Sequence, residues 1–313
     1  MKDTARNAIV VGIGADGSGS ALEFAVAEAQ RTARPVHLVH VLQLPAGEAY
    51  AGVYGGALDT AKSILTDAQA KAEELAGRAV PVSGEVVDNG WTVDDLVRGT
   101  GAEQLLVLQH RAFGRVHRLF TGSITQSVAG RARVPVVSVP EGWTPGSREP
   151  AVVVTVGVQD AVEAPALLRL AFQEAQAREA ALVVLHAWWL ASGYDVVVVD
   201  ETMRTAWTER SQQELEPVLE PLRAEFPDVD VTVEVRHAPP VEAILDAAES
   251  SDLLVLGRRH HLLPFGSHLG PVVRAALDHA TCPVLITPEL GVAQAADEPA
   301  TKHHRVGSMA PTF

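Results

Sequence analysis

Residues 104–108 read QLLVL, and residues 252–256, which lie 148 positions further along the chain, read DLLVL. The same spacing relates Val134-Pro135-Val136 to Cys282-Pro283-Val284. Earlier matches, such as VHLVHV with LVVLHA, keep the same order at slightly smaller spacings. Spacings that drift slowly while the order is kept indicate a duplicated domain with small loop insertions.

Each copy alternates short apolar runs with longer amphipathic stretches, which predicts strands and helices in turn. Runs such as IVV and LLVL are apolar on successive residues, so both faces of the sheet must be covered, as in parallel sheets. We therefore expect an α/β fold: two tandem Rossmann-like domains, each with a five-stranded parallel sheet. The expected strands are 7–13, 35–42, 80–88, 104–108, 135–139, 151–158, 181–186, 229–236, 252–256 and 283–287. The expected helices are 20–33, 58–77, 91–101, 122–132, 163–178, 201–225, 239–250 and 269–280.

The domain boundary is predicted in EGWTPGSREP at 141–150, which is rich in proline, glycine and charge and has no period. The first domain then covers residues 1–142 and the second 151–289. Residues 290–313 are small, polar and aperiodic, and we expect a disordered tail there.

The composition excludes several classes of function. A net charge of −14 disfavours nucleic acids and anionic membranes as partners. Cys282 is the one cysteine of the chain, so neither an intrachain disulfide nor a multi-thiolate metal cluster can form. No apolar run approaches the roughly 18 residues of a membrane span, and no apolar signal-peptide region precedes the first strand. We expect a cytoplasmic protein.

The loop after the first strand is one candidate ligand site, because ligands bind outside the carboxyl ends of parallel strands where the strand order reverses. The first copy carries Gly12, Gly14 and Asp16 there and reads G-x-G-x-x-G, the dinucleotide-binding pattern. The next strand lacks the acidic end residue that would hold a ribose, and the second copy, with Gln159, lacks the glycines. The alternative is that the glycines permit a tight turn.

The loop after the fourth strand is the other candidate. It contains Arg111 and ends in Gly122-Ser123 at a helix start. The second copy has Gly257 and Arg258, and ends at Gly270. Positive charge beside a helix N-terminus favours a phosphate or another small anion. The alternative is a solvated basic loop that neutralises nearby carboxylates.

These segments resemble the nucleotide-binding segment of the universal stress protein family, in which glycines cradle the phosphates and ribose. The closing Cys282-Pro283-Val284 and the strand ending His186-Ala187-Trp188-Trp189 resemble that family as well. The resemblance implies a non-enzymatic stress-response module with two ATP-type pockets. The family's aspartate after the first strand falls on Gly14 and Gln159, and Gln109 replaces its first phosphate-loop glycine, so we expect degenerate pockets.

Two other hypotheses stay open. The first keeps ATP binding and uses arginines of the fourth-strand loops for the phosphates, namely Arg111, Arg115, Arg258 and Arg259. The second is an enzyme, either dinucleotide-dependent or a hydrolase, although no G-x-S-x-G, H-E-x-x-H or Walker lysine motif is present. His40 and His186 recur at equivalent strand ends, where we expect packed or hydrogen-bonded histidines rather than general bases.

Assembly follows from the resemblance, because single-domain members of the family dimerise through their fifth strands. The strands from Val136 to Val139 and from Val284 to Thr287 should then pair within this chain and cover two sheet edges. The expected result is a pseudo-twofold monomer that could form a homodimer.

Overall fold

The computed structural model describes residues 7–15, 17–42, 54–77, 79–87, 105–110, 124–146, 152–161, 164–190, 199–258 and 269–288. The strands are β1 (Ile9–Gly12), β2 (Val36–Val41), β3 (Val82–Val87), β4 (Leu105–His110), β5 (Val136–Pro140), β6 (Val153–Gly157), β7 (Ala181–Trp188), β8 (Val231–His237), β9 (Leu253–Gly257) and β10 (Val284–Thr287). The helices are α1 (Gly19–Thr32), α2 (Tyr54–Ala76), α4 (Ile124–Arg131), α5 (Pro165–Arg178), α7 (Glu201–Glu225), α8 (Pro240–Ser250) and α9 (Pro271–His279).

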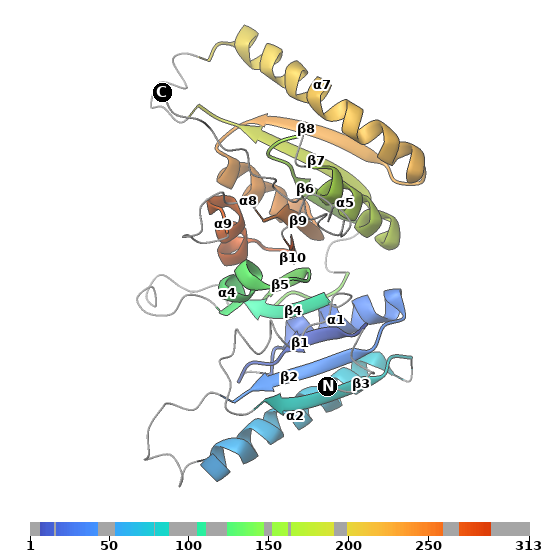
Figure 1. Cartoon of the computed structure of the whole chain (residues 1–313), viewed down its shortest axis with the longest axis vertical. Coiled ribbons are helices and arrows are strands. Elements are labelled where there is room, and N and C mark those ends of the chain that lie inside the picture. The colour runs from blue at the N-terminus through green and yellow to red at the C-terminus, as the bar shows by residue number, and fades with distance from the viewer. Residues whose placement is uncertain are drawn as a thin grey trace, which may run out of the picture.

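All of these strands form one sheet in the order β3-β2-β1-β4-β5-β10-β9-β6-β7-β8 (Figure 1). The strand pairs within each half are parallel, which the continuous apolar runs predicted. In each half the order reverses beside the first strand, between β1 and β4 and between β6 and β9. The helix expected at 91–101 and the tail expected at 290–313 lie outside the described residues.

The two halves meet at β5 and β10, the strands that the family resemblance paired. They are antiparallel, with Val137 opposite Leu285, Val136 opposite Ile286 and Ser138 opposite Val284. Since residues 148 apart are equivalent, this register is symmetric about Val137 and Leu285, as at an interface between two like subunits. The three pairs stop short of Val139 and Thr287, so the ladder is shorter than expected.

Helices cover both faces of the sheet, and each face has its own apolar core. One core packs α1, α2, α5 and α7 against alternate strand residues such as Val107 and Leu285. The other packs α4, α8 and α9 against the intervening residues, such as Leu106 and Ile286, and includes Cys282. Cys282 is fully buried, as expected of a small hydrophobic residue.

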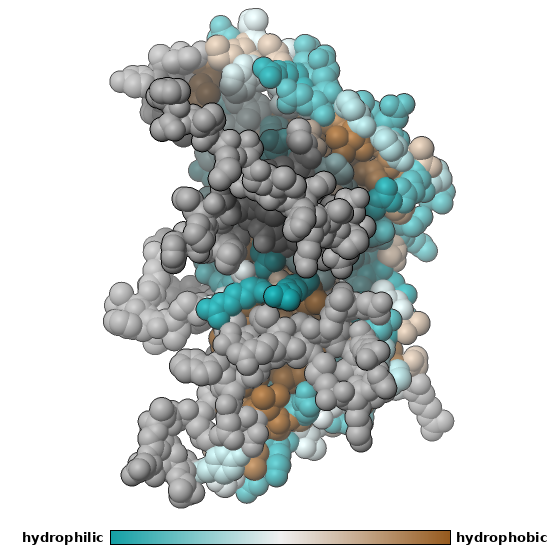
Figure 2. Space-filling view, viewed as in Figure 1, coloured by the Kyte–Doolittle hydropathy of each residue, from teal (hydrophilic) through white to brown (hydrophobic). Residues whose placement is uncertain are grey.

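The described part of the chain contains no helix long and apolar enough to cross a membrane. Among the described residues visible in the space-filling view, hydrophilic and hydrophobic ones lie next to each other (Figure 2).

The strand and loop boundaries differ from the expectation at one position that matters for the site. The fourth strand was expected to end at residue 108, with Gln109 and His110 in the loop. Both residues belong to β4 and pair with Val139 and Pro140 of β5. Because Gln109 and His110 are polar, the sequence pattern did not predict that β4 extends through them; they stay in the strand because β5 continues beside them.

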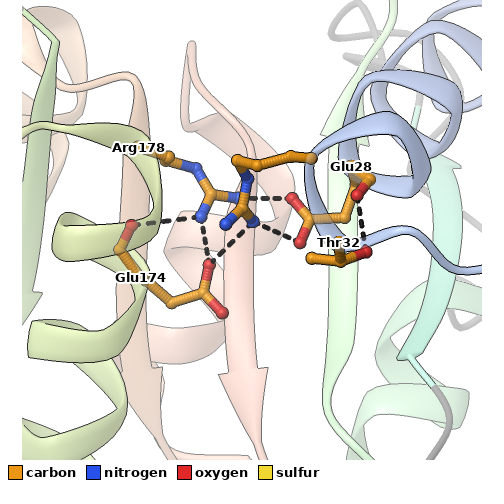
Figure 3. A network of polar contacts seen from close by, with 5 residues as sticks. Glu28, Thr32, Glu174 and Arg178 are labelled. Atoms are coloured by element: carbon orange, nitrogen blue, oxygen red, sulfur yellow. Dashed lines mark hydrogen bonds and ion pairs between the residues drawn. The ribbon is translucent and has the colours of Figure 1, made fainter.

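An ion network joins the two halves on the face of α1 and α5 (Figure 3). Arg178, the last residue of α5, donates through Nη2 to Glu28 Oε2 at 2.8 Å. Glu28 also pairs with Arg31, and Arg178 with Glu174, while Arg31 and Glu174 are 3.7 Å apart. Glu28 is buried, so its charge depends on these two arginines for compensation.

We predict that Arg178→Ala lowers the free energy of unfolding by about 1.5–3 kcal/mol, because a buried carboxylate loses a charge-assisted hydrogen bond. Arg169 is the matched control, since it lies on the same helix and its pair with Glu225 is half-exposed. Arg169→Ala should change the stability by at most about 1 kcal/mol. Urea unfolding of both variants measures the difference, and equal losses would show that the network does not stabilise the domain interface.

Candidate functional site

The candidate sites lie where the strand order reverses, at the carboxyl ends of β1 and β4 in the first domain and of β6 and β9 in the second. The structure places six of the residues that the sequence singled out at or next to these ends. They are Gly12 at the end of β1, Gly14 after it, Gln159 after β6, Gly257 at the end of β9, Arg258 after it and Gly270 before α9. Asp16, Arg111, Gly122 and Ser123 lie outside the described residues.

A hydrogen bond within the turn from β1 into α1 stabilises that turn. Gly17 has a φ of 80°, a conformation that glycine adopts without cost. Ser18, at the N-cap of α1, has a φ of 52°, and its Oγ accepts from the backbone N–H of Gly14 at 2.9 Å. The hydroxyl of Ser18 therefore points back into the turn and does not cap the helix. The geometry supports the tight-turn interpretation of these glycines.

The cap of α1 comes from the fourth strand. Gln109 Oε1 accepts from the backbone N–H of Ser20 at 2.9 Å and of Ala21 at 3.4 Å. These are among the first four N–H groups of the helix, which have no partner inside it. The sequence marked Gln109 as an obstruction to a ligand, and missed that its amide oxygen would serve as an acceptor.

His40 and His186 have the same role in the two copies. His40 Nδ1 donates to the carbonyl of Ile13 at 2.9 Å, and His186 Nδ1 donates to that of Val158 at 3.1 Å. Each histidine ties its strand to the residue just after the first strand of its domain. The expectation of hydrogen-bonded strand-end histidines is confirmed, and since a carbonyl only accepts, Nδ1 carries the proton.

In the second domain, side chains lie close to the glycines at the ends of the strands. A Cβ on Gly157 would lie 2.7 Å from both Ile244 Cδ1 and Leu256 Cδ2, so these two side-chain ends would have to move to admit a larger residue. A Cβ on Gly257 would lie 3.4 Å from Leu167 Cδ2 of α5. Pro271 at the start of α9 has no N–H to offer a ligand.

Arg258 reaches into the other domain. Its Nη1 donates to the carbonyl of Ala129 in α4 at 3.2 Å. That carbonyl belongs to the last turn of a helix, where positive side chains are favoured. Nearby, Gln126 of α4 donates to Asp278 of α9 at 2.7 Å. A residue predicted for phosphate binding thus helps to join the two halves.

His110 is buried at the end of β4 and contacts Ser138 Oγ through Nδ1 at 2.8 Å. Burial lowers the pKa of His110 from 6.5 to about 4; Asp278 raises this pKa and His279 lowers it by smaller amounts. The imidazole is therefore neutral at physiological pH. Ser138 is fully buried, so this serine–histidine pair has no access to a substrate.

Four aromatic rings stack at the carboxyl ends of β7 and β8. Trp188 lies 4.9 Å from Trp207 and 4.2 Å from His237, and Trp189 lies 5.0 Å from His237, between ring centroids. Trp188 is buried, while Trp189 and Trp207 are partly exposed. Trp188 packs between Trp207 and His237. In the described residues, no group of three or more histidine, cysteine or acidic side chains could hold a metal ion.

Comparison with known proteins places these features in a family. The model of the universal stress protein family matches residues 6–140 and again 153–288. A universal stress protein of Mycobacterium tuberculosis (strain ATCC 25618 / H37Rv) is 30% identical over 305 residues, covering 89% of this chain and 94% of its own length. One from Mycolicibacterium smegmatis is 27% identical over 289 residues, covering 89% of this chain and 96% of its own length.

Solved structures share the fold. A universal stress protein from Archaeoglobus fulgidus superposes with a TM-score of 0.66 at 16% identity, covering 90% of this chain and 98% of that one. A protein from Pseudomonas aeruginosa, described as a putative universal stress protein, reaches 0.55 at 16% identity, with 91% and 94% covered. Since the family model matches twice, and the two matches together span almost the whole described chain, this chain belongs to the universal stress protein family and carries its domain in tandem.

Proposed function

We propose that the chain is a non-enzymatic stress-response module of the cytoplasm, whose two ATP-type sites no longer bind ATP tightly. The observation that carries the proposal is the contact of Arg258 with Ala129. The arginine that would grip a phosphate in the second domain donates instead to a carbonyl of the first domain, so its charge serves the domain interface.

Other groups at the sites support the proposal. In the first domain the N–H groups of Gly14, Ser20 and Ala21 have acceptors inside the protein. A phosphate that approached them would have to displace these acceptors, and the displaced bonds would offset its own. Of the arginines in the alternative hypothesis, Arg258 is the one within the described residues, and its Nη1 is bonded to Ala129, so a phosphate there would compete with that contact.

The histidines support a non-enzymatic role. His40 and His186 are tied to backbone carbonyls through Nδ1, and the His110–Ser138 pair is buried. His37 also contacts Ser83 Oγ at 2.9 Å, with Glu85 3.4 Å from its other nitrogen. This contact joins the amino-terminal ends of β2 and β3, away from the carboxyl ends where family ligands are expected.

We predict that ATP binds with a dissociation constant above about 1 mM, which corresponds to only about 4 kcal/mol of binding free energy. Isothermal titration calorimetry of the full chain measures this. Arg258→Ala should lower thermal stability and leave ATP binding unchanged, while Gly257→Val is the matched control beside it. Micromolar binding by the wild type would contradict the proposal, and loss of that binding in Arg258→Ala but not in Gly257→Val would favour the arginine hypothesis.

We predict that ester hydrolysis by the chain stays at the level of the buffer. The readout is release of p-nitrophenol from its acetate, and Ser83→Ala is compared with Ser138→Ala as the buried control. A rate above background that only Ser83→Ala removes would show a serine hydrolase and overturn the non-enzymatic assignment.

We predict a pH dependence of stability that comes from His110. Its folded pKa of about 4 lies below its ordinary 6.5, so the unfolded chain binds the proton first as the pH falls. His110 should therefore lower the free energy of unfolding progressively from about pH 6.5 to pH 4, by about 2 kcal/mol at pH 5. Urea unfolding at pH 7 and pH 5 tests this.

The variant His110→Asn keeps a donor for Ser138 and removes the titrating group, so it should flatten this part of the profile. His186→Asn is the control, because His186 lies in the second domain and is not among the groups that shift the pKa of His110. If the free energy of unfolding falls equally between pH 7 and pH 5 in the wild type and in His110→Asn, His110 does not titrate as described.

A further inference from the structure

The sheet ends in β3 on one side and in β8 on the other, and no strand of the described residues pairs with the outer side of either (Figure 1). In β8 the carbonyl of Asp230 and the N–H of Ala238 both bond to β7. Because backbone groups alternate between the two sides of a strand, those of Val231, Val233 and Val235 point away from the sheet. The outer side of β8 therefore presents backbone donors and acceptors that another strand could pair with.

The side chains of β8 divide between the two faces of the sheet. Val231 and Val233 pack against the core beneath α7. Glu234 and Arg236 lie on the other face, where Arg236 Nη1 donates to the carbonyl of Ala243 in α8 at 3.5 Å. Arg236 Nε donates to Glu234 Oε1 at 2.9 Å, and the two side chains are 30% and 40% exposed. The edge thus carries one basic and one acidic group, two residues apart on the same face.

This spacing is self-complementary in an antiparallel pair of β8 strands. If Val235 lies opposite Val235 of a second copy, Glu234 of each copy lies opposite Arg236 of the other. The backbone groups of Glu234 and Arg236 point to β7, so these are the pairs without hydrogen bonds, in which opposed side chains come closest. Two ion pairs can therefore form across the twofold axis.

Neighbouring registers match the charges less well. An axis through Glu234 sets two glutamates against each other, which is unfavourable. An axis through Val233 pairs Arg236 with Asp230 but leaves Glu234 opposite Thr232. The charges therefore favour the first register.

The edge at β3 has no such complementarity. Glu85 is the one charged residue of this strand, VSGEVV. In an antiparallel pair of β3 strands it would face an uncharged residue or a second Glu85. β3 thus provides a matched control on the same sheet.

Two exposed tryptophans lie at the carboxyl end of the β8 edge. Trp189 is 36% exposed and Trp207 44%. His237, the last residue of β8, stacks on Trp189 and on Trp188, and Trp188 contacts Trp207. Since His237 is only two residues from Val235, a twofold axis there would bring the tryptophans of both copies to one junction. Tryptophan is enriched at protein interfaces.

We propose that β8 is a self-association edge, at which two copies of the chain join antiparallel about Val235 to form a continuous sheet. Charges on an edge strand ordinarily keep other strands away, but here they have opposite signs at matching positions. The occupant is a second copy because the acid and the base complement each other under a twofold axis. The same patch is used by both copies, so the assembly closes as a dimer.

The first test removes one backbone donor from the edge. The N–H of Val235 points outward, so Val235→Pro should leave the hydrogen bonds between β8 and β7 in place. Val86→Pro is the matched control on β3, because the carbonyls of Pro81 and Val87 bond to β2 and the groups of Val86 point outward. Sedimentation equilibrium of the full chain over a range of concentrations is the measurement. The wild type and Val86→Pro should dimerise, and Val235→Pro should remain a monomer.

The second test reverses the charges. Glu234→Arg and Arg236→Glu each oppose like charges in both pairs, so each should weaken the dimer about tenfold or more. An equimolar mixture of the two variants should restore it, because both arginines of one chain then face glutamates of the other. Neither variant keeps the bond between positions 234 and 236 of its own chain, so this recovery reports on contacts between chains. Glu85→Arg on β3 should dimerise like the wild type.

Three results would overturn the inference. The first is a wild type that sediments as a monomer at every concentration. The second is a dimer that Val235→Pro and Val86→Pro weaken equally, which would place the contact elsewhere. The third is a mixture of the two charge variants that stays monomeric, which would exclude the register about Val235. Thermal melting shows whether each variant is folded; if Val235→Pro is not, the charge variants decide, because both of their side chains are partly exposed.

Discussion

The antiparallel seam between β5 and β10 is the contact on which the rest of the structure depends. Each half is a parallel sheet that would otherwise end in an exposed strand rich in valine, leucine and isoleucine. Pairing these two edges turns two sheets into one, and it brings α1 against α5 on one face and α4 against α9 on the other. The ion network and the contact of Arg258 with Ala129 exist because the seam places those helices side by side.

The fold could be predicted largely from the sequence, and the seam only through the family. Apolar runs on successive residues require a sheet covered on both faces, and the repeat at 148 residues shows that this happens twice. Periodicity does not report which edges meet, because the pairing of β5 with β10 depends on surfaces that are distant in the chain. The end of β4 was missed for a related reason: Gln109 and His110 are polar, and only their partners in β5 keep them in the sheet.

The sequence predicted where the candidate site would lie, but not the hydrogen-bond partners of its side chains. Strand ends and glycines led to the prediction of a ligand site at the carboxyl edge of the sheet, and the histidines at 40 and 186 were interpreted correctly. The partners of Gln109 and Arg258 could not be foreseen. Gln109 acts on a helix 89 residues away, and Arg258 acts across a domain boundary. A local sequence pattern can assign a side chain to a ligand, but the folded chain can offer that side chain a protein partner instead. The sequence alone does not show which of the two lies closer.

The ion network has a consequence for which copies can pair. Thr32 and Arg178 end two helices of equal length, so they occupy the same position in the two domains. Glu28 of the first domain meets the arginine of the second, an arrangement that requires the two partners to differ. If first domains from two separate chains met along the same seam, each Glu28 would face a threonine in place of Arg178, and Arg31 of the other chain would stand to it as Arg31 stands to Glu174 here, at the longer distance of 3.7 Å. The network therefore favours the pairing of a first domain with a second domain over the pairing of two first domains.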